Sequence, residues 1–140
     1  MEINKQNTIK YFLVVLLFIS CNSSWSQKSP CILLQIIVND DYCKRTFQLD
    51  SHSGAIVFVD KTKNFDSCSL DSVYKRKVYL THDSSLEKEN MSNIYIEKFE
   101  IKDSIYKIYL FQRLSQGTGY LEIKKKDGKY FIIKRAIGYF

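Results

Sequence analysis

The residues from Gly119 to Arg135, GYLEIKKKDGKYFIIKR, carry the most explicit structural signal in the chain. Two runs in which apolar and polar residues nearly alternate flank an Asp-Gly dipeptide, and such a dipeptide is a common hairpin turn. The pattern therefore predicts a β-hairpin with strands over 119–125 and 129–135.

Two registers of this hairpin compete. A two-residue turn at Asp-Gly pairs Lys124 with Phe131, which mixes apolar and polar side chains on each face. A three-residue loop pairs Ile123 with Phe131 and leaves only Ile132 on the wrong face. Because a shift of one residue moves every side chain across the sheet, the apolar pattern favours the three-residue loop, with Gly128 left-handed and a bulge beside it.

Strand signals continue upstream of the hairpin. Two long runs, 94–102 and 105–114, are predicted strands joined at Asp103-Ser104, and the second alternates apolar residues toward both faces. The segment 55–59 is apolar at every position, which indicates a central strand buried on both faces. Further short strands are predicted over 45–49 and 78–81, with a polar loop over 60–71.

A helix is predicted over Pro30–Cys43. Ser29 supplies an N-cap and Pro30 a favourable first helical residue, although the apolar run CILLQIIV is also compatible with a buried strand. With the strands, this predicts an α+β fold in which one N-terminal helix packs on a curved antiparallel β-sheet of about six or seven strands. An all-β meander or barrel is the alternative.

The N-terminal segment has the pattern of an export signal. Lys5 and Lys10 precede nine apolar residues, 11–19, and a small, polar segment follows as far as Ser26. A helix needs about 20 apolar residues to span a bilayer, so this run is short for a permanent anchor, which remains a lesser alternative.

Two cleavage points are compatible with this signal. Phe18-Ile19-Ser20 before Cys21 is similar to a bacterial lipobox, which makes Cys21 a candidate lipidation site, whereas small residues at Ser24 and Ser26 fit ordinary cleavage after 26. We predict a signal peptide over 1–20, a tether over 21–29 and one exported β-rich domain over 30–140. The expected location is the bacterial cell envelope, lipid-anchored or periplasmic, or the medium.

Charge and cysteine usage constrain the partners. The formal net charge of +6 is interspersed along the chain, which fits an exported surface, or weak attraction to anionic lipid or polysaccharide, better than nucleic-acid binding. Cys31, Cys43 and Cys68 remain after export. An oxidising compartment favours one disulfide, and we predict Cys43–Cys68 because one ends the helix and the other lies in a long loop; three free thiols are the alternative.

No spacing of histidine and cysteine predicts a metal or a cofactor. His52 and His82 lie in separate predicted turns, and the acidic loop 60–71 lacks the glycine that a calcium loop needs. A small thiol-dependent hydrolase that pairs a cysteine such as Cys31 with either histidine remains an alternative function.

A basic and aromatic hairpin tip is the candidate partner-binding surface. It could hold an acidic protein or a glycan, or it could be a charged edge that prevents aggregation. Its residues are Lys124, Lys125, Lys126, Lys129 and Tyr130. The leading hypothesis is therefore a small exported protein, a lipoprotein of the envelope, with a non-catalytic binding or accessory role.

Overall fold

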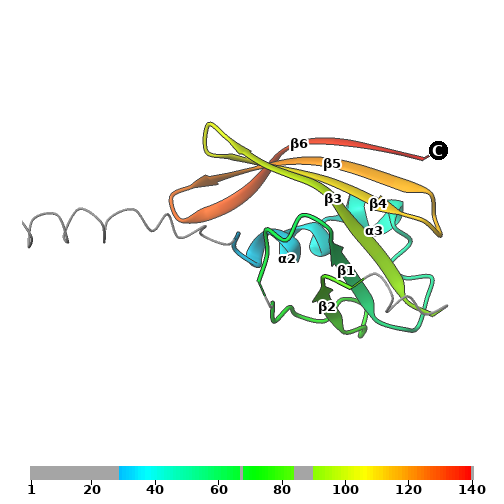
Figure 1. Cartoon of the computed structure of the whole chain (residues 1–140). Helices are drawn as coiled ribbons and strands as arrows, with labels where there is room; N and C mark the ends of the chain where they lie inside the picture. Colours follow the sequence, from blue (N-terminus) through cyan, green and yellow to red (C-terminus); the bar gives the residue numbers. More distant parts are fainter. Residues whose placement is uncertain (1–28, 67, 84–89, 140) are drawn as a thin grey trace, which may run out of the picture.

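A computed structural model describes residues 29–66, 68–83 and 90–139, and it has two short helices on one face of a six-stranded sheet (Figure 1). The strand order is β2-β1-β3-β4-β5-β6, and the sheet is open. The elements are α2 (Ile32–Asn39), α3 (Asp41–Thr46), β1 (Ile56–Asp60), β2 (Val78–Thr81), β3 (Ser92–Lys102), β4 (Ile105–Gln112), β5 (Gly117–Lys126) and β6 (Lys129–Tyr139). The predicted α+β class is confirmed in this coarse form, and the closed-barrel alternative is wrong.

The predicted helix is present but broken. It begins at Ile32 and is interrupted at Asp40, whose extended backbone (ψ 126°) ends α2. The Asp40 side chain accepts a hydrogen bond from the Cys43 N–H at 3.1 Å and so caps α3. The predicted Ser29 cap is not used, and 45–49 is helix and turn rather than a strand, because the cap at Asp40 restarts the helix.

The sheet is mixed rather than antiparallel. β1 lies between β2 and β3 and runs parallel to both. All five residues of β1 are buried, which confirms the predicted central strand. The antiparallel expectation holds only for β3 to β6, since local patterns do not encode the neighbours of a strand.

The β3–β4 hairpin follows the prediction. Asp103 and Ser104 both have positive φ, 52° and 62°, as a two-residue hairpin turn requires. On β4, Ile108 and Leu110 belong to the main core, whereas Phe111 packs in a smaller cluster with β1 and β3 residues.

The predicted register of the last hairpin is wrong. β5 and β6 pair Lys124 with Phe131 and Lys126 with Lys129, around a two-residue turn in which Asp127 and Gly128 both have positive φ. The bulge lies further along, because Ile123 pairs with Ile132 and Glu122 with Lys134, so that Ile133 has no partner. The bulge restores the apolar pattern beyond it, and therefore the mixed faces near the turn do not exclude this register.

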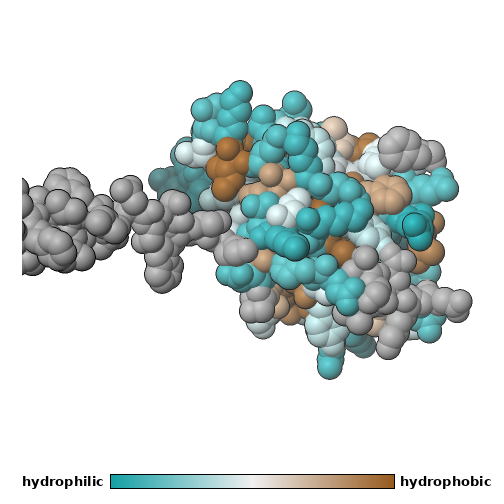
Figure 2. Space-filling model, in the orientation of Figure 1, coloured by the Kyte–Doolittle hydropathy of each residue, from teal (hydrophilic) through white to brown (hydrophobic). Residues whose placement is uncertain are grey.

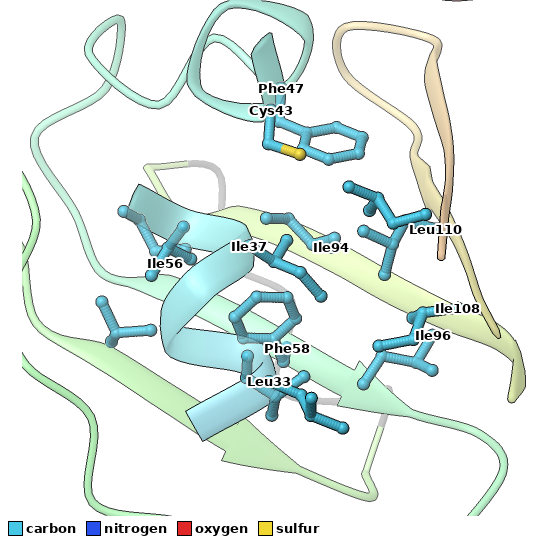
Figure 3. Close-up of a cluster of buried hydrophobic side chains, with 14 of the residues drawn as sticks. Leu33, Ile37, Cys43, Phe47, Ile56, Phe58, Ile94, Ile96, Ile108 and Leu110 are labelled. Atoms are coloured by element: carbon cyan, nitrogen blue, oxygen red, sulfur yellow. The ribbon is translucent and has the colours of Figure 1, made fainter. Parts of the chain in front are cut away.

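Both helices pack on one face of the sheet through the main core (Figure 3). Leu33 and Ile37 of α2 and Phe47 after α3 are fully buried against side chains of β1, β3 and β4. Those strand side chains include Ile56, Phe58, Ile94, Ile96, Ile108 and Leu110. The core fixes both helices beneath the sheet and places the break at Asp40 close to β6.

A buried arginine joins the loops that precede β1 and β3. Arg76 donates hydrogen bonds to the carbonyl oxygens of Leu49, Gly54 and Ala55 and to Ser92 Oγ, the last two at 3.1 and 2.9 Å. Burial lowers the pKa of this guanidinium. Four oxygen acceptors therefore compensate a cation that is 5% exposed.

Candidate binding groove beside β6

β6 forms one edge of the sheet. Within the described ranges, β5 is its only strand neighbour, so the opposite side of β6 is unpaired. An edge strand is paired on one side only. On its other side, alternate backbone N–H and C=O groups are free to hydrogen-bond to another extended chain. The candidate groove lies along this edge.

An open groove of about 410 Å³ lies beside this edge. One wall is the end of α2, with Ile36, Asn39 and Asp40. The β6 residues that line it are Tyr130, Phe131, Ile132 and Arg135. An extended strand and a helix end thus line a shallow, open space, and the pairing of β6 with β5 leaves that side of the strand accessible.

An ion pair crosses the groove from wall to wall. Arg135 Nη2 and Nε donate to Asp40 Oδ2 at 2.6 and 3.0 Å. Burial raises the pKa of Asp40, but hydrogen bonds from Arg135 and from the Cys43 N–H, with the positive charge of Arg135, outweigh that effect and lower the pKa overall. Asp40 is thus held as a carboxylate, and it both caps α3 and fixes Arg135.

The groove has an apolar floor. Ile36, Tyr130 and Ile132 are partly buried and pack against the main core. The Tyr130 ring lies 5.9 Å from that of Tyr106 on β4. Phe131, next along β6, is half exposed. An apolar side chain entering the groove would therefore contact aliphatic and aromatic surface.

The predicted basic tip lies at one end of this groove. Lys125 is positioned over the Tyr130 ring, with its Nζ 5.4 Å from the centroid. Lys124, Lys126 and Lys129 are exposed. The fold thus brings Tyr130, one of the predicted partner-binding residues, into the groove itself, and the binding role of the tip stays a prediction.

The predicted disulfide partner of Cys68 is wrong. Cys68 is bonded to Cys31, with the two Cα atoms 5.6 Å apart, and Cys43 is free and buried. Cys43 belongs to the core face of α3, whereas Cys31 precedes α2 and meets the loop after β1. Burial, followed by the charge of Asp40, raises the pKa of the Cys43 thiol, which is the opposite of nucleophile activation.

The contacts of His82 are with Asp60 rather than with a cysteine of the described residues. His82 follows β2, and its Nδ1 lies 3.8 Å from Oδ2 of the fully buried Asp60. That carboxylate also accepts hydrogen bonds from the Thr62 and Phe65 N–H groups at 2.9 and 3.0 Å. The Asp60 side chain therefore organises the loop after β1. His52 is partly exposed.

The part of the chain that the structure describes contains neither a metal-ligand cluster nor a membrane-spanning helix. No group of three or more His, Cys, Asp or Glu side chains there could hold a metal ion. No helix there is long and apolar enough to cross a membrane. The predicted signal peptide, Cys21 and the tether as far as 28 lie outside the described residues.

Sequence reasoning missed the helix side of the groove and Arg135. Asp40 and Arg135 are 95 positions apart, and no local pattern joins them. Ile132 was the one residue that could have indicated the groove. The predicted register left this apolar residue on the wrong face of the sheet, and in the structure it lines the groove. Comparisons of the chain with family models, curated proteins and solved structures give no match.

Proposed function

We propose that this protein is an exported, lipid-anchored binding protein of the bacterial cell envelope, which holds a partner protein in the groove beside β6. The observation that carries the binding role is the groove itself, an open space lined by both apolar and polar side chains next to an unpaired strand edge. Such sites bind protein segments through backbone and side-chain contacts together.

Two features support export. The apolar run 11–19 and Cys21 have the order of a lipoprotein signal. The Cys31–Cys68 disulfide is of the kind that persists in oxidising compartments. A lipid at Cys21 would keep the groove close to a membrane surface, where an accessory protein meets its partners.

The thiol-hydrolase alternative has less support. Cys31 and Cys68 are joined to each other, and the Cys43 thiol is buried with a raised pKa. A nucleophilic cysteine needs an accessible thiolate. A binding role requires none of these groups to react.

The first experiment tests the location. The protein is recovered from its native host, its intact mass is measured, and the Cys21→Ser variant is fractionated beside the wild type. We expect a mature chain that begins at a lipidated Cys21, and loss of membrane association in the variant. A cytosolic protein with Met1 attached and reduced thiols would contradict the proposal.

The second experiment tests the groove. Asn39→Trp places a bulky side chain at an exposed position of the helix wall, whereas Leu114→Trp introduces the same side chain at an exposed residue outside the groove. Crosslinking in the native host should capture a partner with wild type and Leu114→Trp but not with Asn39→Trp, because the added ring blocks the groove whatever the charge of the partner. An identical set of crosslinked partners for all three proteins would refute the groove as the binding site.

A further inference from the structure

We propose that the partner segment is an acidic, extended peptide, which adds to the outer edge of β6 as a seventh strand. This inference rests on the proposed function, because it concerns the same groove. It specifies the conformation of the bound segment and its charge, neither of which follows from the presence of a groove alone.

The backbone of β6 supports strand addition. β6 spans eleven residues, Lys129–Tyr139, without a proline. Its pairing with β5 uses one side of the strand, so the outward alternate amides and carbonyls can hydrogen-bond to an added chain. A second chain would lie about 4.8 Å from β6. The added chain would therefore run beside β6 and border the groove.

The groove then receives alternate side chains of the added strand. Successive side chains of a strand point to opposite faces. Those directed to the helix side would contact Ile36 and Ile132, and those directed to the open face would lie beside Phe131 and Ile133, each 50% exposed. In the view of Figure 2 the surface is largely hydrophilic, with apolar patches scattered over it. An apolar residue at a groove-facing position follows from this geometry.

The positive charge of the β5–β6 hairpin favours an acidic partner. β6 contains Lys129, Lys134 and Arg135 and no acidic residue. The carboxylates of the helix wall are already neutralised, Asp40 by Arg135 and Asp41 by Lys44 at 3.2 Å. The remaining positive charge of the tip, on Lys124, Lys126 and Lys129, faces solvent. Acidic side chains in the added strand would therefore complement the hairpin.

The same charges disfavour a second copy of this chain as the occupant. Two β6 strands that paired edge to edge would bring Lys129 and Lys134 of both copies to one interface, where Glu122 lies near Lys134 but no acidic residue of β6 offsets them. Like charges placed opposite each other across a strand pair are destabilising. A different, acidic chain avoids this repulsion.

The test uses a defined probe with the processed full-length protein. The probe is a capped, fluorescent peptide in which Glu-Val is repeated four times, and its counterpart has lysine in place of glutamate. Fluorescence anisotropy should show that the acidic peptide binds about tenfold more tightly than the basic one. Equal affinities, or no binding of the acidic peptide, would overturn the inference.

N-methylation of the probe separates strand addition from charge attraction. One version of the acidic peptide is methylated on every glutamate amide, and a second on every valine amide. Because alternate amides of a strand point to opposite edges, one version should lose binding and the other should retain it. Binding that tolerates both methylated sets would refute the added strand.

Protein variants locate the bound probe. Lys126→Glu with Lys129→Glu should weaken the acidic peptide by about tenfold. The matched control Lys75→Glu with Lys77→Glu changes two exposed lysines just before β2, at the opposite edge of the sheet from β6, and should leave the affinity unchanged. An equal effect of both changes would show that net charge alone attracts the peptide, against the inference. A native partner that still depends on Asn39, with no peptide binding, would refute the strand while the proposed function stood.

Discussion

Arg135 on β6 and Asp40 between the two helices form an ion pair at 2.6 Å, although 95 positions separate them in the chain. The pair joins the last strand to the break between α2 and α3. It also fixes the width of the groove, because each residue belongs to one of its walls.

We predict that the two partners of this pair contribute unequally to stability. Arg135→Met removes a partly exposed ion pair and should lower the free energy of unfolding by about 1 kcal/mol. Asp40→Ala also removes the cap of α3 and should cost about 2 kcal/mol. Urea unfolding of both variants and of the double variant measures this. Equal costs for the two single variants would show that the cap contributes nothing.

The pair also predicts a pH dependence. Burial raises the pKa of Asp40, but Arg135 and the Cys43 N–H more than offset it, so the folded pKa lies below the ordinary value. The stabilisation by the carboxylate is then complete above the ordinary pKa of about 4 and is lost as the pH falls through the folded pKa.

Asp40→Asn tests this pH dependence because it keeps an oxygen that can cap α3. The difference in unfolding free energy between wild type and variant should be largest at about pH 5 and should shrink toward about pH 2. Urea titrations at several pH values measure it. A difference that does not vary with pH would contradict the assigned role of the charge.

Arg76→Lys should destabilise the protein although it conserves the charge. A lysine cannot replace a guanidinium that donates to four separate oxygen atoms. We expect a loss of about 3 kcal/mol or more, since buried acceptors lose their donors. The matched control is Lys77→Met at the exposed next residue, which should change the urea midpoint little. Similar urea midpoints for both variants would contradict the stabilising role of the four Arg76 hydrogen bonds.

The disulfide predicts distinct behaviour for the three cysteines. Cys31→Ser or Cys68→Ser should cost about 4 kcal/mol in the chain-entropy model, because the bond closes a loop between positions 37 apart. Cys43→Ala should leave the crosslink intact, as mass spectrometry of unreduced peptides will show. The Cys43 thiol of the native protein should react with a maleimide only after unfolding, and rapid labelling in the folded state would contradict its burial.

The turn of the last hairpin predicts a backbone effect. Gly128 has φ +75° and no atom within 4 Å of an added Cβ, so Gly128→Val should cost about 1–2 kcal/mol through strain alone. Lys126→Val adds the same side chain at the exposed end of β5 and serves as the control. Coinciding urea midpoints of Gly128→Val and wild type would contradict the left-handed turn.

Local patterns in the sequence predicted much of the secondary structure. Alternation in β4, the Asp103-Ser104 turn and the uniformly apolar β1 were identified because each depends on neighbouring residues alone. The register of β5 and β6 was missed because the bulge at Ile133 lies away from the turn, and a bulge can restore the apolar pattern after either register.

By itself, the amino-acid sequence determined the segments that form β1, β3 and β4 and the apolar residues within them, since these follow from short-range periodicity and turn chemistry, whereas the predicted strand over 45–49 is helix and turn. Only the tertiary structure decided the parallel neighbours of β1, the Cys31–Cys68 bond and the groove beside β6. Each of these depends on contacts between residues far apart in the chain. Such contacts form when the helices and the sheet bury a common core, and no local pattern specifies that packing.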